Sequence, residues 1–469
     1  MTSVLLIYPF FRRRLDRSRF RFPPLGIAYV AAGLRQASHS VQVLDCTFLS
    51  RDEAVRQAFA MRADVVGIYC MVTMEEDCLG FARVLRGRSR LLIAGGPLPT
   101  CEPERFLPHF DAVVRGEGEQ TMVEIMAAHE TGADVAAVPG VLCRRSEGAE
   151  ADGVAALGTG AACPESSAAA SSPQRPFASD LDRLPFPARD LLPNRQYIEF
   201  GRKSYGFSIS TVMSTRGCPF RCEFCSNVVF GDSYRERSAA NMADEIEEVL
   251  ALGYDRISFA DDVFTMDRRR VLAICEEIRQ RGLRFAWECL GRVDAFDLDA
   301  ARAMKAAGCF RIFFGIESGN DRILRLMNKR ITTAQAASAV LTAHRAGLEV
   351  GAFFIVCYPG ESDDTVLDTL RFATSLPLDY LGLTMPYPLP GTALFARVGD
   401  RVTRAWRPQE TPLVNHVLTF EGDFSAAKMR FALHKGRIQF EMRRRLGTWA
   451  PVALGLFEGP SDALFKLLR

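Results

Sequence analysis

Three cysteines in one short stretch carry the clearest chemical signal in this sequence. Cys218, Cys222 and Cys225 lie at spacings of four and three residues in Cys-Pro-Phe-Arg-Cys-Glu-Phe-Cys. One loop with this spacing can wrap three corners of an iron–sulfur cube, because such clusters are held by cysteine thiolates. Three thiolates leave one iron of a four-iron cluster without a protein ligand. A metal with an open coordination position can bind a substrate or a cofactor, as catalytic zinc does.

The alternatives for the same three cysteines are a zinc knuckle and three unrelated buried cysteines. Structural zinc takes four protein ligands within a characteristic spacing. The nearest histidine after Cys225 is His344, which lies far outside that spacing. The pattern therefore favours a cluster over zinc.

The stretch resembles the radical S-adenosylmethionine (radical SAM) superfamily, whose hallmark is CxxxCxxC with an aromatic residue before the last cysteine, here Phe224. The resemblance implies that Cys218, Cys222 and Cys225 hold a [4Fe–4S] cluster. It also implies that the amine and carboxylate of S-adenosylmethionine chelate the fourth iron, and that one electron cleaves this cofactor to a 5′-deoxyadenosyl radical. An electron donor such as a flavodoxin or a ferredoxin is implied as a partner.

The composition limits the fold and the location of the protein. A chain of 469 residues exceeds one ordinary hydrophobic core, so we expect two or three domains. A formal net charge of +2 provides no general attraction to nucleic acid. The chain opens Met-Thr-Ser-Val-Leu-Leu-Ile, which is no secretory signal, and no apolar run is long enough to cross a bilayer. We therefore expect a cytoplasmic protein whose thirteen cysteines stay reduced.

Residues 1–143 have the pattern of a doubly wound, flavodoxin-like α/β domain. Their short, continuous apolar runs indicate parallel strands that are covered on both faces. Such a sheet binds its ligand at the carboxyl ends of its strands. Two turns at these ends contain Gly95, Gly96, Gly116 and Gly118, and glycine lets a large ligand approach the backbone. The five expected strands are residues 4–8, 41–44, 65–69, 91–94 and 112–114.

Together with Pro23-Pro-Leu-Gly-Ile-Ala-Tyr-Val30, this pattern is similar to the cobalamin-binding domain that precedes the radical domain in one branch of the superfamily. The familiar cobalamin domains carry Asp-x-His-x-x-Gly, whose histidine ligates cobalt from below, and this chain has no such motif. His39, His109 and His129 lie in other contexts. We therefore expect cobalamin to bind without a histidine ligand. The alternative is a degenerate domain that has lost the cofactor.

Residues 144–195 are predicted to join the two domains. Residues 144–176 are rich in Ala, Gly, Ser and Pro and contain no aromatic residue, so they cannot bury enough apolar surface and are predicted to form a flexible linker. An extended, proline-rich brace is predicted from Asp180 onwards.

Residues 196–394 repeat a strand-then-helix unit six times, which predicts an open, partial (β/α)6 version of the eight-unit barrel. Catalytic groups in that architecture lie at the carboxyl ends of the strands. The expected strands are residues 209–214, 256–260, 284–290, 310–315, 350–357 and 380–385, with helices at 242–252, 268–281, 300–307 and 333–346 between them.

Polar residues follow consecutive predicted strands of this barrel. They are Asp261 and Asp262 after the second strand, Arg292 and Asp294 after the third, Glu317 and Ser318 after the fourth, and Glu361 after the fifth. Each of them alone could instead cap a helix or face solvent. Their position at one mouth favours a binding site for a zwitterion and a ribose diol.

The resemblance implies roles for four of these residues. Asp261 and Asp262 lie where the family binds the methionyl amine, although the family's usual Gly-Gly-Glu is replaced here by Ala-Asp-Asp. Arg292 lies where a basic side chain meets the methionyl carboxylate. Glu317 lies in the ribose region.

Residues 395–469 are predicted to be mainly helical. Residues 425–445 place apolar side chains at helical spacing and have a basic opposite face. Such a helix can pack its apolar stripe on the barrel and leave its arginines in water. A membrane-surface face is the alternative. Packing is favoured, because any packed helix shows this periodicity.

The resemblance implies a cobalamin-dependent radical SAM enzyme that methylates an unactivated carbon of a small molecule, such as a secondary metabolite, a lipid or a tetrapyrrole. In that chemistry the deoxyadenosyl radical removes hydrogen, cobalamin supplies the methyl group, and the protein positions both cofactors. One alternative is an oxidative cyclase or ring-rearranging enzyme of the anaerobic tetrapyrrole cyclase type. Another is an iron–sulfur electron-transfer or binding protein. The sequence identifies no catalytic side chain.

Overall fold

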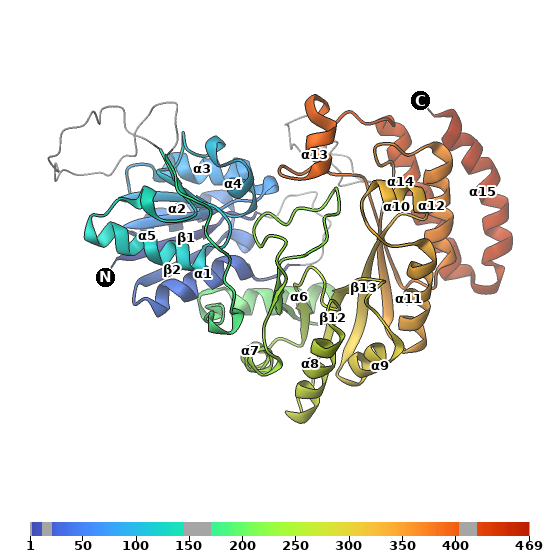
Figure 1. Cartoon of the computed structure of the whole chain (residues 1–469), viewed down its shortest axis with the longest axis horizontal. Helices are drawn as coiled ribbons and strands as arrows, with labels where there is room; N and C mark the ends of the chain where they lie inside the picture. Colours follow the sequence, from blue (N-terminus) through green and yellow to red (C-terminus); the bar gives the residue numbers. More distant parts are fainter. Residues whose placement is uncertain (1, 12–20, 145–169, 403–419, 469) are drawn as a thin grey trace. The chain divides into compact units, whose positions relative to one another are not determined.

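A computed structural model describes residues 2–11, 21–144, 170–402 and 420–468 (Figure 1). The chain divides into two compact units. Unit 1 comprises Met1–Ser208 and Asn227–Arg235, and unit 2 comprises Ile209–Ser226 and Glu236–Arg469. Among the described residues, no helix is both long enough and apolar enough to span a bilayer.

Unit 1 contains the predicted doubly wound sheet. Its parallel strands occur in the order β2-β1-β3-β4-β5, which confirms the flavodoxin-like prediction. The bounds are β1 (Ser3–Tyr8), β2 (Ser40–Asp45), β3 (Val65–Tyr69), β4 (Leu91–Gly95) and β5 (Ala112–Val114).

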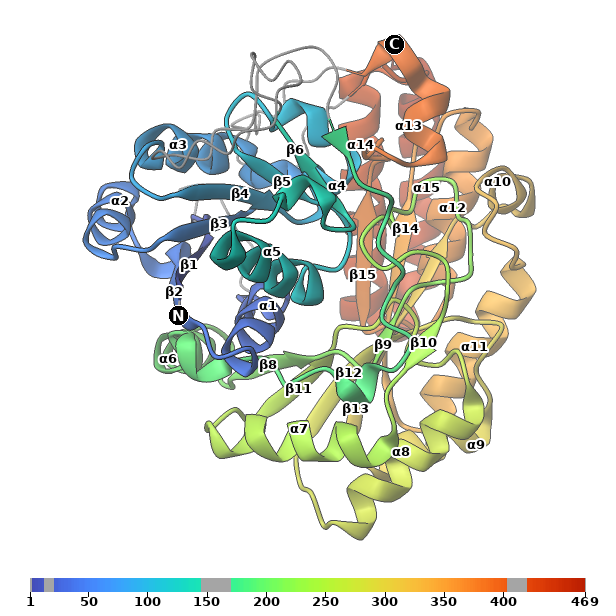
Figure 2. The same cartoon turned by 60° about the vertical axis from the view of Figure 1, so that its left-hand side comes forward.

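The continuous apolar runs of unit 1 follow from helices on both faces of the sheet (Figure 2). Leu5 and Ile7 of β1 point into one core with Phe81, whereas Val4 and Leu6 point into the other. The helices are α1 (Leu25–Gln36) and α5 (Glu119–Thr131) on one face, and α2 (Arg51–Ala60), α3 (Glu75–Leu85) and α4 (Pro97–Cys101) on the other. α6 (Asn194–Tyr205) also belongs to unit 1.

In the part of unit 1 that the structure describes, the sheet has seven strands rather than the five predicted. β6 (Val141–Cys143) pairs antiparallel with β5, and β7 (Ala170–Ser171) pairs antiparallel with β6. The predicted flexible linker was therefore wrong for its last residues, while residues 145–169 lie outside the described part. Backbone pairing needs no apolar side chain, and the Ser172 hydroxyl also donates to the Val141 carbonyl (2.8 Å).

Unit 2 contains six parallel strands in sequential order, which confirms the partial barrel. They are β8 (Ile209–Val212), β11 (Arg256–Phe259), β12 (Ala286–Gly291), β13 (Cys309–Glu317), β14 (Glu349–Ile355) and β15 (Tyr380–Thr384). The short strands β9 (Thr215–Arg216) and β10 (Arg235–Glu236) precede and follow the cysteine stretch in sequence.

The helices between these strands begin at polar caps. Ser238, Asp267, Asp297, Thr332 and Ser362 each accept a hydrogen bond from a backbone N–H of the following first turn. The helices are α7 (Ala239–Ala251), α8 (Arg268–Gln280), α9 (Leu298–Ala306), α10 (Asp321–Leu326), α11 (Thr333–Arg345) and α12 (Asp363–Ser375).

The C-terminal segment is helical, as predicted, with α13 (Ala393–Val398), α14 (Ala426–Leu446) and α15 (Ala450–Leu467). α14 packs on α12 and β15 and buries Met429 and Leu433, so its apolar stripe faces the barrel as expected. α15 packs on α14 and α12 and forms the outer layer of this part of unit 2 (Figure 1).

Candidate functional site

The cysteine loop of unit 2 follows β8 at the carboxyl edge of the sheet, and Asp261 fixes its beginning. Asp261 Oδ1 accepts hydrogen bonds from the backbone N–H groups of Ser214 (2.6 Å) and Thr215 (2.9 Å), and Oδ2 accepts from the Ser214 hydroxyl. Arg270 lies 3.8 Å from Oδ2. Burial raises the pKa of Asp261, and these donors and Arg270 oppose that shift.

Glu223 anchors the middle of the same loop. Its carboxylate accepts a hydrogen bond from the Tyr358 hydroxyl (2.7 Å) and pairs with Arg397 Nε (3.1 Å). Its backbone N–H donates to the Met327 carbonyl (2.9 Å), and its carbonyl accepts from the Leu394 N–H (2.8 Å). Three separate segments of unit 2 therefore hold the loop, which preorganises the cysteines between its anchors.

The three thiols of the loop lie close enough to influence one another. Cys218 and Cys222 are half-buried, and Cys225 is exposed as a residue. Desolvation of its thiol is the main cause that raises the pKa of Cys225 to about 12, and the charges of Cys222, Asp262 and Cys218 raise it further. Binding to iron would deprotonate these thiols, because the thiolate is the metal ligand.

The spacing of the three cysteines is compatible with a [4Fe–4S] cluster. Within the described ranges, no group of three or more His, Cys, Asp and Glu side chains is arranged to hold one ion. Thiolates at three corners of a cube lie farther apart than the ligands of one zinc ion, so this finding is compatible with a cluster. The residues present therefore fit a [4Fe–4S] cluster held by Cys218, Cys222 and Cys225.

Two buried cations lie beside the aromatic residues of the loop. The Arg292 guanidinium carbon is 3.5 Å from the centroid of the Phe220 ring, and the Lys329 ammonium is 5.7 Å from the centroid of Phe224. Arg292 Nη2 also donates to the Lys329 carbonyl (2.7 Å). Lys329 Nζ pairs with Glu317 Oε1 (3.0 Å). These cations can offset the negative charge of thiolates and of a cluster.

The backbone around Lys329 is strained. Asn328 (φ 51°) and Arg330 (φ 56°), on either side of it, are left-handed without being glycine, as is Glu317 (φ 72°). Each such position costs about 1–2 kcal/mol and persists only where its surroundings enforce it. The Asn328 side-chain amide donates to the Arg221 carbonyl of the cysteine loop (2.6 Å), which is one such constraint. The left-handed residues on either side of Lys329 therefore fix its backbone beside the loop.

The predicted cofactor residues occupy different environments. Asp261 is buried, and both of its oxygens accept hydrogen bonds from the protein, so the geometry gives it a structural role in the loop. Asp262 is exposed and near the thiols, which leaves its carboxylate open to a ligand. Arg292 and Glu317 are buried beside the loop and are tied to each other through Lys329. Their contacts with S-adenosylmethionine stay predictions.

Sequence reasoning missed Lys329, Glu223 and Tyr358. Lys329 follows a helix rather than a strand, so the rule that selected the other residues does not reach it. Tyr358 and Glu223 are 135 positions apart, and no spacing signals such a pair. The left-handed residues around Lys329 are Asn328 and Arg330. Neither is a glycine, so the sequence gives no sign of their unusual backbone conformation.

In unit 1, the carboxyl edge of the sheet presents aromatic rings and glycines. Tyr8 and Tyr69 end the neighbouring strands β1 and β3, where the strand order reverses, and their ring centroids are 5.4 Å apart. Ligands of doubly wound sheets bind at this point. Gly96 (φ 109°) is required by the fold itself, because a Cβ there would lie 2.7 Å from the Cys70 carbonyl.

The other three predicted glycines differ in how much room they leave. A Cβ at Gly118 would lie 3.2 Å from Val30, so this glycine serves packing. A Cβ at Gly95 or Gly116 would meet nothing closer than 3.9 Å or 3.7 Å, respectively. These are ordinary contact distances, and Gly116 (φ 76°) also has a left-handed backbone that favours glycine. Binding of a large flat cofactor at this edge remains the predicted role of all four glycines.

The histidines of unit 1 lie at the opposite edge of the sheet. His39 directly precedes β2, His109 precedes β5, and His129 is in the last turn of α5, which runs back toward the start of the strands. An imidazole at the amino ends of the strands cannot ligate a metal at their carboxyl ends. This placement supports the prediction of cobalamin without a histidine ligand.

Comparison with known families gives two matches along the chain. Residues 14–126 match the model of the B12 binding domain, and residues 212–373 match that of the radical SAM superfamily. The two matches fall on the two units that carry the edge and the loop described above.

Individual relatives extend over most of the chain. An uncharacterised methyltransferase of Pyrococcus horikoshii is 33% identical over 436 residues, covering 90% of this chain and 89% of the relative. The anaerobic magnesium-protoporphyrin IX monomethyl ester cyclase of Rubrivivax gelatinosus is 28% identical and covers 85% of this chain and 70% of its own. The fold is similar to that of the cobalamin-dependent S-adenosylmethionine radical enzyme OxsB, solved with aqua-cobalamin bound, with a TM-score of 0.75. The match has 15% sequence identity and covers 99% of this chain and 72% of that chain.

Proposed function

The chain belongs to the radical SAM enzymes that carry an N-terminal B12-binding domain, and we propose that it is a cobalamin-dependent methyltransferase acting on an unactivated carbon of a small molecule. This family membership confirms the predicted use of a [4Fe–4S] cluster, S-adenosylmethionine and cobalamin. The observation that supports the proposal most directly is that one chain combines the anchored cysteine loop of unit 2 with a glycine-containing sheet edge in unit 1.

The residues of the loop have separable tasks. Asp261 and Glu223 fix its backbone, so that Cys218, Cys222 and Cys225 are presented together. Arg292 and Lys329 supply positive charge beside the thiolates. When bound, the cluster and the two cofactors supply the radical and the methyl group, which no side chain can provide.

The remaining polar groups suit S-adenosylmethionine. We assign the methionyl amine to the exposed Asp262, the methionyl carboxylate to the region of Arg292, and the ribose to that of Glu317. These contacts pair each charge of a zwitterion with its opposite and a diol with a carboxylate. Gly95, Gly96, Gly116 and Gly118 are assigned to the cobalamin edge, with no imidazole as lower ligand.

The overall reaction balances with two molecules of S-adenosylmethionine and two electrons. A substrate C–H bond becomes C–CH₃. One S-adenosylmethionine leaves as methionine and 5′-deoxyadenosine, which carries the removed hydrogen, and the other leaves as S-adenosylhomocysteine. An external low-potential donor, such as a flavodoxin or a ferredoxin, must provide the electrons.

Oxidative cyclisation is the second candidate, because the cyclase of Rubrivivax gelatinosus aligns over 85% of this chain. Product counting separates the two. A methyltransferase releases 5′-deoxyadenosine and S-adenosylhomocysteine in comparable amounts and passes a CD₃ group from labelled S-adenosylmethionine to its product. Substrate conversion with deoxyadenosine but without S-adenosylhomocysteine or label would replace the methyltransferase proposal by the cyclase.

A further inference from the structure

The outer side of α15 is apolar. Val452, Leu456, Leu464 and Leu467 recur at helical spacing, and three of them are at least 60% exposed: Val452 (60%), Leu456 (75%) and Leu467 (77%). Monomeric soluble proteins rarely expose a continuous apolar strip of this kind without an interaction partner.

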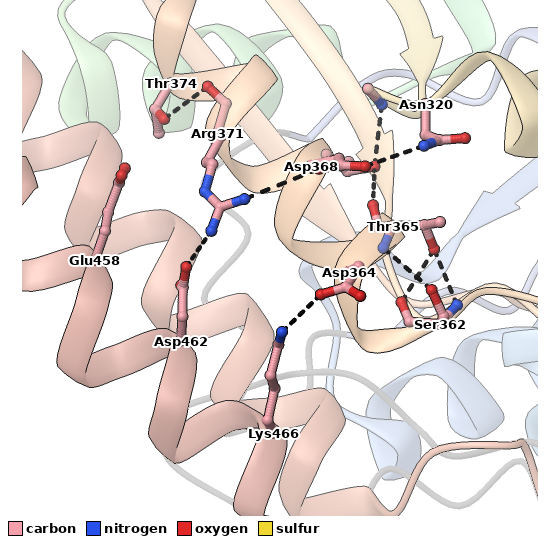
Figure 3. A network of polar contacts seen from close by, with 12 residues as sticks. Asn320, Ser362, Asp364, Thr365, Asp368, Arg371, Thr374, Glu458, Asp462 and Lys466 are labelled. Atoms are coloured by element: carbon pink, nitrogen blue, oxygen red, sulfur yellow. Dashed lines mark hydrogen bonds and ion pairs between the residues drawn. The ribbon is translucent and has the colours of Figure 1, made fainter.

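The polar side chains of α15 point the other way, into unit 2 (Figure 3). Asp462 is buried and pairs with Arg371 of α12 and with Lys435 of α14 (2.9 Å). Glu458 accepts a hydrogen bond from the Gln439 amide (2.9 Å), and Lys466 pairs with Asp364 (2.7 Å).

A surface helix usually turns its apolar side inward and its polar side to solvent. α15 buries Phe465, but it also buries Asp462 and leaves Val452, Leu456 and Leu467 exposed. Lys435 is only 2% exposed, so rotating α15 would leave a buried ammonium without its carboxylate. That would be strongly unfavourable. The ion pairs therefore hold the apolar side of α15 in solvent.

The neighbouring helix α14 adds positive charge. Arg437, Arg444 and Arg445 are exposed, and Arg430 is half-exposed. Glu441 is the only acidic residue in the α14 sequence, and it pairs with both Arg444 and Arg445 (2.9 Å each). α14 thus presents a basic outer side.

Trp449 lies between the two helices and is 72% exposed. Tryptophan at the junction of apolar and charged surface is typical of side chains that lie at the headgroup level of a bilayer. Ile438 of α14 (47% exposed) adds to the apolar part of this surface.

We propose that the outer sides of α14 and α15 bind the surface of a bilayer that contains anionic phospholipids. The apolar strip of α15 would enter the acyl boundary, and the arginines of α14 would contact the headgroups. An 18-residue helix is about 27 Å long, enough for an in-plane contact. A second copy of the chain is a poorer partner, because two arginine-rich sides would meet at such an interface.

Vesicle flotation tests this surface. The full chain, with its cluster and cobalamin reconstituted, is mixed with vesicles of phosphatidylcholine alone or with an equimolar mixture of phosphatidylcholine and phosphatidylglycerol. We expect flotation with the mixed vesicles, weakened by salt, and little with phosphatidylcholine alone. The L456E/L467E variant should bind at least about tenfold more weakly. The R444Q/R445Q variant should lose the preference for anionic lipid.

Leu341→Glu is the matched control, because Leu341 is an exposed leucine (42%) on α11, a helix that is not part of this surface. It should float like the wild type. Circular dichroism and the bound cofactors check that each variant is folded. Failure of the folded wild type to float with either vesicle overturns the proposal. A dimer in solution that L456E/L467E dissociates, without lipid binding by the wild type, would assign the surface to a second copy instead.

Discussion

The carboxyl edges of the two sheets are built from different side chains. At the centre of the edge in unit 1 lie Tyr8 and Tyr69, and the glycines Gly95 and Gly116 follow the neighbouring strands. At the edge in unit 2, Asp261 accepts hydrogen bonds from the backbone of the cysteine loop, and Glu317 pairs with Lys329. Asp262 is exposed. A large, mostly uncharged ligand binds where the protein surface fits its shape and lets it approach the backbone. Thiolates around iron are instead stabilised by positive charges held close to them. The two edges therefore match the two kinds of cofactor that the family uses.

The largest effect is expected at the cysteine loop. Replacing Cys218, Cys222 or Cys225 by Ala should abolish the cluster, because each thiolate holds one corner. The wild type should carry roughly four irons and four sulfides per chain after anaerobic reconstitution. Iron and sulfide analysis and the visible spectrum measure the loss.

Cys275→Ala is the control for this series. Cys275 lies on the buried side of α8, remote in sequence from the loop, and its replacement should leave the iron content unchanged. Equal loss of iron from Cys275→Ala and from the loop variants would contradict the assignment of the three ligands.

The second prediction concerns the counter-charges of unit 2. Lys329→Met should lower the free energy of unfolding by about 3–5 kcal/mol, because Glu317 would be left buried without a cation. Lys329→Met combined with Glu317→Gln should recover part of this loss, since no unpaired charge remains. Urea denaturation of the reconstituted protein measures both.

Lys305→Met on α9 is the matched control for this pair, because Lys305 is exposed. Its effect should stay within about 0.5 kcal/mol. If the double variant is no more stable than Lys329→Met alone, the ion pair is not the cause of the loss.

The sequence predicts an element well where its own side chains determine it, and poorly where backbone pairing or residues distant in the sequence determine it. β1 and β3 were predicted within one residue because apolar runs buried on both faces have few alternatives. β6 and β7 were missed because they are two or three residues long and are held mainly by backbone hydrogen bonds. Helix periodicity identified α14, but it could not show that Asp462 of α15 points inward, because that depends on partners far away in the sequence.

The charged residues of the site show the same limit. The strand-end rule selected Asp261, yet only the structure shows that its oxygens serve the loop. The same rule did not select Lys329, because Lys329 does not follow a strand and its position depends on the left-handed residues Asn328 and Arg330.

The third prediction concerns Glu361 of unit 2, a buried carboxyl group for which the described part of the chain shows hydrogen bonds but no ion pair. Burial raises the pKa of Glu361 to about 8, although the Tyr358 N–H donates to its Oε2 (2.8 Å). The folded state therefore binds this proton more tightly than the unfolded state, whose value is near 4.5. The contribution of Glu361 to the free energy of unfolding is therefore complete below pH 4.5 and is lost as the pH rises toward about 8.

Glu361→Gln should remove this part of the pH dependence, because the amide resembles the protonated acid. The slope removed is at most about 1.4 kcal/mol per pH unit. Urea denaturation across the same pH range measures it. The exposed Glu276→Gln serves as the control and should keep the slope of the wild type. A wild-type slope that persists in Glu361→Gln would assign the effect to another group.

The smallest effect is expected for the histidines of unit 1. His39, His109 and His129 lie at the amino ends of the strands, and cobalamin is predicted to bind at the carboxyl ends without an imidazole ligand. Each of the three substitutions to Ala should therefore leave a base-off absorption spectrum and the amount of bound cobalamin unchanged. Gly95→Phe provides the contrast, because its Cβ would make only ordinary contact with Val114 (3.9 Å) while the added ring would crowd the edge where cobalamin is predicted to bind, so a folded variant should lose the cofactor. Loss of the bound spectrum in a folded histidine variant would instead identify an axial imidazole, and the uncharged edge would then no longer be sufficient to explain how unit 1 holds cobalt.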